Sequence, residues 1–184
     1  MNLEKIEKAT YMLLEAIGEN PERPGLLETP KRVANMYKEI LNGYKIQEDC
    51  HLKTKFEVES LGVLIEKDIM FYSLCEHHLL PFFGKVHVAY LPQNQVVGLS
   101  KIPRTVEVFS KRLQLQEQMT FQIASVLFSN LQATGVLVVS EAEHMCMSMR
   151  GVKSSGTITK HMVALGEFKT NDSLRSDTLK LMGL

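Results

Sequence analysis

Residues 84–92 constrain the fold most, because they form a strand pattern without a polar face. Successive side chains of a strand point to opposite faces of a sheet. Both alternating sets are largely apolar here, namely Val86, Val88 and Tyr90 on one face and His87, Ala89 and Leu91 on the other. A strand with this pattern is usually covered on both sides. We therefore expect covering elements on each face of this strand.

Helical and extended patterns occur in blocks along the chain. Apolar spacing predicts a helix over residues 3–17 and a second from Thr29 to about Gly43, with Thr29-Pro30 as N-cap and first-turn proline. Two arms of a hairpin are expected over 56–65 and 69–72. Helices are expected over 100–112 and 116–133, strands over 135–142 and 156–166, and a closing helix over 172–181. Such segregation predicts an α+β fold with an antiparallel sheet.

Length and topology predict one domain that associates with copies of itself. A chain of 184 residues without an internal repeat fits a single domain over 1–184, with a helical N-terminal segment over 1–50 followed by a part of strands and helices over 51–184. Four strands and two helices leave sheet edges and one sheet face without a cover inside the chain. Oligomerisation is the usual remedy.

Charge and cysteine content narrow the partners and the compartment. Lys+Arg and Asp+Glu both count 21, whereas proteins that hold long polyanions carry a basic excess. Nucleic acid and anionic membranes are therefore poor candidate partners. The start of the chain has no signal-peptide pattern, and no window is apolar enough for a membrane span. Three cysteines, an odd number, then indicate reduced thiols in the cytoplasm.

Two short segments, Cys75-Glu76-His77-His78 and His144-Met145-Cys146, contain most of the residues that can bind a metal. Cys75 and His78 lie on one side of a turn, and His144 and Cys146 would face the same way at the end of an extended segment. Thiolate and imidazole ligands together favour zinc. Four ligands would make a closed structural site, whereas Cys75, His78 and Cys146 alone would leave a position for water. Spacing leaves both arrangements open, and it also allows two unrelated loops.

The sequence strongly resembles the GTP cyclohydrolase I family across almost its whole length. The matching stretches share motif content and order with that family. They are Thr29-Pro30-Lys31-Arg32-Val33-Ala34, residues 73–84 around Cys75, residues 87–92, residues 98–104 around Lys101, Gln114-Leu115-Gln116-Glu117, His144-Met145-Cys146-Met147 and Arg150-Gly151-Val152.

This resemblance implies hydrolytic opening of the GTP imidazole ring, with release of formate and formation of 7,8-dihydroneopterin triphosphate, the first step of tetrahydrofolate and pterin biosynthesis. It implies one zinc per subunit held by Cys75, His78 and Cys146, a fourth position open to water, and His144 and His77 as proton-transfer groups. The implied fold is the tunnelling fold, four antiparallel strands with two helices. The family forms a homodecamer of two stacked pentamers with active sites between subunits.

Other residues are candidates for substrate binding. Gln116 and Glu117, at a predicted helix start, are two of these candidates. The Glu117 carboxylate can accept two hydrogen bonds from the guanine edge, which adenine does not offer. It can equally favour the helix N-terminus. The sequence has no P-loop motif that would bind the triphosphate. Basic side chains that converge near the amides at a helix start could bind it instead. The candidates are Ser100, Lys101, Arg104, Arg150 and Arg32, although most such charges are only solvated surface groups.

Two departures from the family pattern and two rival functions remain. The family often has arginine at the position of Gln118, and an aromatic residue near the end, where this chain has Arg175-Ser176-Asp177-Thr178-Leu179. A tetrahydropterin synthase is one rival, although such enzymes hold zinc with histidines. The other rival is an oligomeric scaffold in which zinc, held by all four side chains, has no catalytic role.

Overall fold

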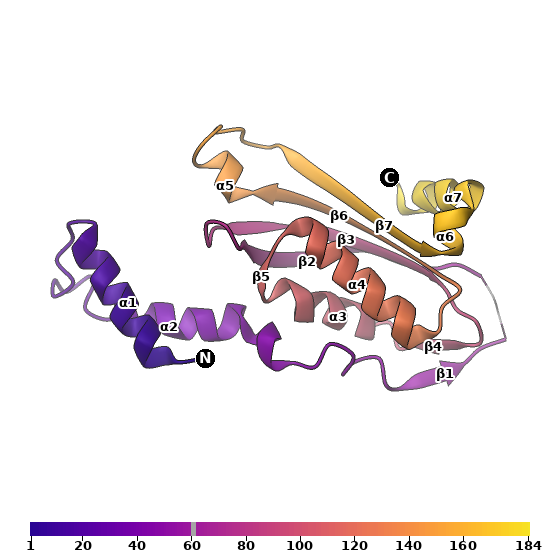
Figure 1. Ribbon diagram of the computed structural model, residues 1–184, viewed down its shortest axis with the longest axis horizontal. Helices are drawn as coiled ribbons and strands as arrows, with labels where there is room; N and C mark the ends of the chain where they lie inside the picture. The colour runs from indigo at the N-terminus through magenta and orange to yellow at the C-terminus, as the bar shows by residue number, and fades with distance from the viewer. Residues whose placement is uncertain (60–61) are drawn as a thin grey trace. The chain divides into compact units, whose positions relative to one another are not determined.

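The computed structural model describes residues 1–59 and 62–184, which form two compact units, Met1–Asn42 and Gly43–Leu184. The first unit contains α1 (Leu3–Ala16) and α2 (Thr29–Ile40), which pack against each other (Figure 1). Asn2 caps α1 through its side chain, which accepts from the Lys5 amide. In α2, Thr29 is already helical and Glu28 is the N-cap, so the predicted boundary was one residue late. Both predicted N-terminal helices are confirmed.

The second unit is built on a five-stranded sheet with the order β5-β2-β3-β6-β7. The four long strands, β2, β3, β6 and β7, pair with one another in antiparallel fashion. The two-residue strand β5 is parallel to the end of β2. A separate two-stranded sheet pairs β1 with β4. The bounds are β1 (Lys55–Glu57), β2 (Leu64–Cys75), β3 (Pro81–Leu91), β4 (Gln95–Val97), β5 (Leu113–Gln114), β6 (Gly135–His144) and β7 (Ile158–Gly166).

Helices cover one face of the sheet along its length and part of the other. On the first face, α3 (Lys101–Ser110) and α4 (Gln116–Leu131) bury the β3 side chains Val86, Val88 and Tyr90. On the second, α6 (Glu167–Thr170) and α7 (Asp172–Met182) supply Phe168 and Met182 against Ala89 (Figure 1). The apolar pattern of residues 84–92 thus predicted covered faces correctly. The α+β class with four antiparallel strands and two helices, the tunnelling-fold arrangement, is confirmed.

The predicted hairpin before residue 72 was wrong. The first expected arm is divided between β1, which contains residues 56–57, and β2, which contains residues 64–65, whereas the second arm lies within β2. Ser60 and Leu61 of the first arm lie outside the described residues. The polar run before Ile69 looked like a turn but forms a bulge. The register against β3 shifts between Glu66 and Ile69, and Asp68 adopts a φ of 60°. Lys85 on β3 donates to Asp68 Oδ1 at 2.7 Å, which fixes the bulge to the neighbouring strand.

The sheet leaves edges and apolar surface uncovered within the described part of the chain. No described strand pairs with the outer side of β7, and β2 has an outer neighbour only at its last two residues. The second sheet face exposes side chains beyond the reach of α6 and α7, which are Met70, Tyr72, Ile158 and Met162. None of the described helices is long and apolar enough to cross a membrane.

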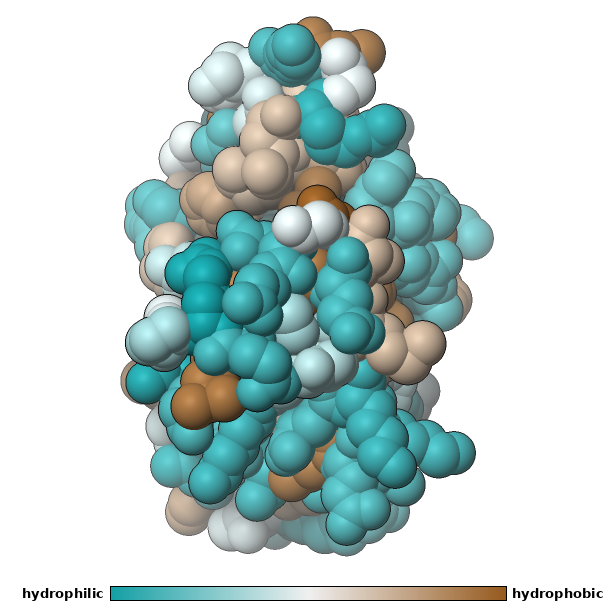
Figure 2. All heavy atoms as spheres, turned by 90° about the vertical axis from the view of Figure 1, so that its left-hand side faces the viewer, coloured by the Kyte–Doolittle hydropathy of each residue, from teal (hydrophilic) through white to brown (hydrophobic). Residues whose placement is uncertain are grey.

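The surface in Figure 2 is mainly hydrophilic, and apolar side chains occur there in separate small patches. Charged residues make up 23% of the chain, with equal numbers of acidic and basic side chains. This view therefore shows no continuous apolar surface among the described residues that it displays.

Candidate metal centre and substrate site

A tight turn between β2 and β3 brings Cys75 and His78 together. The Leu79 amide donates to the Cys75 carbonyl at 2.9 Å, and the Cys75 amide donates to the Leu80 carbonyl at 2.9 Å. Leu79 has a φ of 55°, a left-handed conformation that reverses the chain within this turn. Cys75 is the last residue of β2, and its side chain is buried.

Cys146 reaches the same place from the end of β6. The strand ends at His144, and the chain immediately forms a single helical turn, α5 (Met145–Ser148). This turn separates the directions of His144 and Cys146, so the expectation that both would face the same way was wrong. Extended geometry, on which that expectation depended, ends at His144, two residues before Cys146. The predicted convergence of the two segments is correct, because β3 and β6 are paired and Phe82 lies opposite His144.

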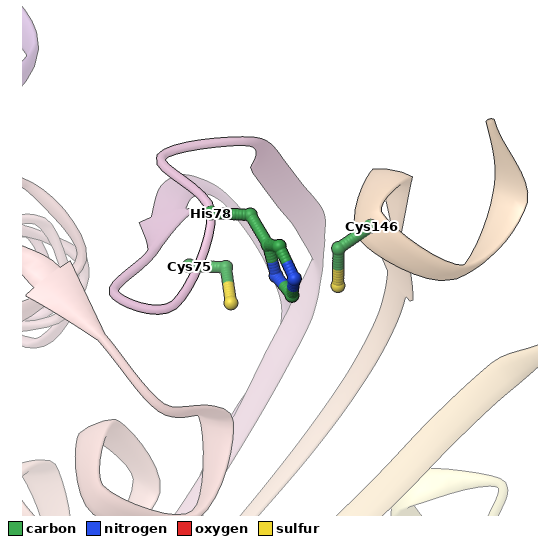
Figure 3. Close-up of side chains that lie close together, drawn as sticks. All are labelled: Cys75, His78 and Cys146. Atoms are coloured by element: carbon green, nitrogen blue, oxygen red, sulfur yellow. The ribbon is translucent and has the colours of Figure 1, made fainter. Parts of the chain in front are cut away.

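Cys75, His78 and Cys146 form a cluster that could hold a metal ion. The two Sγ atoms and an imidazole nitrogen all lie within 4.8 Å of one another. Figure 3 shows the imidazole of His78 between the two thiols, with Cys146 approaching from α5. Two sulfur ligands and one imidazole are a donor set that zinc prefers over magnesium or calcium. His144 does not belong to this cluster among the described residues.

The electrostatics of the cluster favour a bound cation. Burial raises the pKa of the Cys146 thiol, and the nearby Cys75 raises the same pKa further by charge repulsion and hydrogen bonding. Two thiolates this close therefore repel each other unless a positive charge lies between them. The residues present thus fit a divalent metal by geometry, by donor chemistry and by charge.

His144 is held in a polar and aromatic pocket beside the cluster. Its ring stacks on Phe82 with centroids 4.8 Å apart and planes 1° from parallel. Its Nε2 lies 2.8 Å from Oε1 of Gln116. Burial lowers the pKa of His144, and the charge of Glu117 opposes this shift. The lowered pKa favours the neutral imidazole, which is the form that accepts a proton.

His77, the second predicted proton-transfer group, is exposed in the β2–β3 turn. Its ring lies 6.2 Å from that of His78, and the two rings are nearly perpendicular. His77 does not belong to the group of Cys75, His78 and Cys146 that could hold a metal ion.

The loop after α5 places Arg150 beside the cluster. Arg150 Nη1 lies 3.1 Å from Nε2 of His78. Glu143 anchors this loop, because its Oε1 accepts from the Ser148 hydroxyl at 2.7 Å and from the Gly156 amide at 3.3 Å. These hydrogen bonds hold the pKa of Glu143 below its ordinary value. Glu143 was not identified from the sequence as a residue that supports the site. Its only indication in the sequence is its position directly before His144.

The other predicted substrate residues are dispersed in the structure. Glu117 is exposed in the first turn of α4, directly after the buried Gln116. Ser100, Lys101 and Arg104 lie at the start of α3, whereas the Cys75 end of β2 pairs with β5, beyond the other end of that helix. Ten helical residues span about 15 Å. The start of α3 thus lies at the end of the helix opposite to β5 and the cluster. Arg32 belongs to the N-terminal unit, where it is exposed.

Known proteins resemble this chain over its full length. The family model for GTP cyclohydrolase I matches residues 6–183. GTP cyclohydrolase 1 of Finegoldia magna is 54% identical over 184 residues, 100% of both chains. The Clostridium kluyveri protein of that name is 54% identical over 99% of this chain and 98% of its own. That of Streptococcus pneumoniae is 51% identical over 100% of both.

A solved structure, archaeosine synthase QueF-Like in the apo form, aligns with a TM-score of 0.45 and 15% identity over 59% of this chain and 97% of its own. Family membership is shown by the full-length sequence matches and not by this structural similarity. The chain therefore belongs to the GTP cyclohydrolase I family of enzymes and has GTP cyclohydrolase activity.

Proposed function

We propose that this chain opens the imidazole ring of GTP by hydrolysis at the Cys75, His78 and Cys146 cluster. The products would be formate and 7,8-dihydroneopterin triphosphate, as the first step of tetrahydrofolate and pterin biosynthesis. One observation carries the proposal: three ligands converge within 4.8 Å, while the fourth candidate, His144, is hydrogen-bonded to Gln116 instead. That arrangement supports an open, catalytic site over a closed, structural one.

One zinc ion per subunit is the proposed cofactor, with Cys75, His78 and Cys146 as its ligands. When bound, zinc lowers the pKa of a water molecule towards 7 and so makes hydroxide available at neutral pH. The chain contributes the fixed positions of the three ligands. The β2–β3 turn holds two of them, and α5 holds the third.

Proton transfer is assigned to His144 and His77. Attack on the carbon between the two nitrogens of the five-membered ring is productive only if a ring nitrogen gains a proton. Opening of the ring and release of formate then need further proton transfers. A neutral imidazole, which is the form that the lowered pKa of His144 favours, can accept a proton in one step and return it in the next. His77 lies in the same turn as two proposed ligands.

Recognition of the guanine base is assigned to Glu117. A carboxylate can accept from the ring N–H and the exocyclic amine of guanine together. Its position in the first turn of α4, next to the residue that contacts His144, supports this role.

Binding of the triphosphate is assigned to Ser100, Lys101, Arg104, Arg150 and Arg32. The separation between the start of α3 and the cluster supports a site completed by a second subunit. A homodecamer of two pentamers would meet this need, and it would also cover the open edges of β2 and β7. On this account, residues 1–184 act as one catalytic domain, with 1–50 as its helical N-terminal segment. Three free cysteines favour the cytoplasm as its compartment.

Formate release tests the proposed reaction. The zinc-loaded protein is incubated with GTP, and formate is measured together with the fluorescent pterin that forms on oxidation. We expect both products in equal amounts. A pterin-modifying synthase would release no formate, and a zinc scaffold would leave GTP unchanged. Either result would contradict the proposal.

A further inference from the structure

Gln116 is a buried side chain whose amide orientation can be deduced from its surroundings. It is 1% exposed. Its Nε2 donates towards the Ser140 carbonyl at 3.2 Å, the Ser140 hydroxyl at 3.0 Å and the Thr159 carbonyl at 3.0 Å. If the amide were turned over, its oxygen would face two main-chain carbonyl oxygens, which cannot donate a proton. The nitrogen must therefore point towards Ser140 and Thr159, and the oxygen towards His144.

The hydroxyl groups around Gln116 support the same direction. Thr120 Oγ1 donates to the Gln116 carbonyl at 2.7 Å, which uses its single proton. Its 2.7 Å contact with Ser140 Oγ must therefore be donated by Ser140. The Ser140 oxygen keeps its lone pairs for the Gln116 amide. Every donor in this buried network thus has an acceptor, and no rotation of Gln116 would preserve the balance.

This orientation determines the tautomer of His144. Oε1 of Gln116 can only accept a hydrogen bond, so the nitrogen 2.8 Å away, Nε2 of His144, must carry a proton. In the neutral imidazole, Nδ1 is then the only atom that can take up a proton. The parallel stack on Phe82 limits rotation of the same ring.

We infer that Gln116 is a positioning residue, which keeps His144 in the Nε2–H tautomer with Nδ1 as its proton acceptor. The sequence placed Gln116 among the substrate-binding residues. Its burial, together with the engagement of both ends of its amide, instead directs its side chain to His144. The inference rests on the proposed role of His144 in proton transfer.

The test compares kcat with GTP affinity in Gln116→Met, which keeps the side-chain length and removes the amide. We expect kcat to fall about 10- to 100-fold, because the ring loses its fixed tautomer and orientation. The dissociation constant for GTP and the zinc content should stay within about twofold of wild type. If this variant does not fold, Gln116→Asn keeps the amide but draws it back from His144, and the same loss of kcat is expected.

The matched control is Gln114→Met. Gln114 is also a buried glutamine, 3% exposed, and its amide donates to the Phe109 carbonyl and to Gln122. We expect this variant to lose thermal stability and to keep kcat within about twofold when zinc content is matched. An equal fall of kcat in Gln116→Met and Gln114→Met would show that Gln116 has only a structural role. A weakened GTP affinity with unchanged kcat in Gln116→Met would make it a substrate contact. Either outcome would overturn the inference.

A further pair of measurements separates this inference from the proposed function. If His144→Ala retained wild-type turnover, the proposed role of His144 would fail, and the inference with it. If His144→Ala lost turnover while Gln116→Met kept full kcat, only the inference would fail. In the His144→Ala background, Gln116→Met should lower kcat by less than about twofold further, because Gln116 acts through the His144 ring.

Discussion

At the scale of single residues, side chains that are close in sequence make different contacts. Cys146 lies in the cluster with Cys75 and His78. His144, two positions earlier, stacks on Phe82 and is hydrogen-bonded to Gln116. The resemblance supplied the proposed metal ligands, and spacing alone left His144 as a possible fourth one. The sequence could not show the bond between His144 and Gln116. It joins residues 28 positions apart, and its direction depends on Ser140 and Thr159.

His144→Ala separates a catalytic role from a ligand role. We expect one zinc per subunit and an intact fold, because the three cluster residues remain. Turnover should fall by about 10²- to 10⁴-fold, the usual loss when a proton-transfer group is removed. Zinc analysis and formate release measure the two effects. His51→Ala, a histidine in a polar loop, is the control and should change neither. Loss of zinc in His144→Ala would favour the scaffold.

Glu117→Ala tests guanine recognition. Removal of the carboxylate takes away the acceptor for the guanine edge, so the preference for GTP over ATP should fall about 100-fold in kcat/KM. Zinc content should stay unchanged. The neighbouring exposed Gln118→Ala is the control and should keep the wild-type preference. If Glu117→Ala rejected ATP as firmly as the wild type does, the assignment of Glu117 would be wrong.

At the scale of elements, the long patterns were predictable and the irregular ones were not. Strands 84–92 and 135–142 were identified because their apolar runs are continuous, and β3 and β6 confirm them. The β2 bulge was mistaken for a turn, because Glu66, Lys67 and Asp68 have the polarity of a turn. β5 has only two residues, and α5 only four, which is too short for a periodic pattern.

The bulge predicts a pH-dependent stability. Burial raises the pKa of Glu66 to about 7, above its ordinary value of 4.5. The folded state therefore binds an extra proton between these values, and the stability that this proton provides is lost as the pH rises through 7. Glu66→Gln removes the titration. Between pH 4.5 and 8, its free energy of unfolding should rise relative to wild type by roughly 1 kcal/mol, a value reduced for the partial solvent exposure of the group.

Urea unfolding at pH 4.5, 6 and 8, at one fixed protein concentration, measures this difference. The control is Glu57→Gln on β1, where the side chain is exposed. We expect its difference from wild type to be the same at all three pH values. A constant difference for Glu66→Gln would show that Glu66 does not titrate in this range.

At the scale of the whole molecule, we propose that a second subunit completes the site. The proposed phosphate-binding residues at the start of α3 lie about a helix length from the cluster. The edges of β2 and β7 have no outer partner over most of their length among the described residues. A second subunit that pairs with such an edge can bring its own residues to the cluster. The sequence predicted this need from the uncovered edges, but it could not predict which side chains cross.

Mixed assemblies test whether the site is shared. Cys75→Ser should lack metal, and a variant with Lys101→Ala and Arg104→Ala should lack phosphate binding, so each alone should be inactive. When the two are co-expressed in equal amounts, about one quarter of the sites should combine an intact cluster with intact cations from a neighbour. Formate release should recover to about that fraction. No recovery in confirmed mixed assemblies would place all these residues in one subunit.

The coordination of the bound metal tests the central claim most directly. X-ray absorption at the zinc edge of the purified enzyme distinguishes sulfur from lighter ligands and counts imidazole rings. The account predicts two sulfurs, one imidazole and one oxygen from solvent, with the same spectrum in His144→Ala. Two sulfurs and two imidazoles in the wild type would contradict it, because the position required for the hydrolytic reaction would be filled by the protein itself.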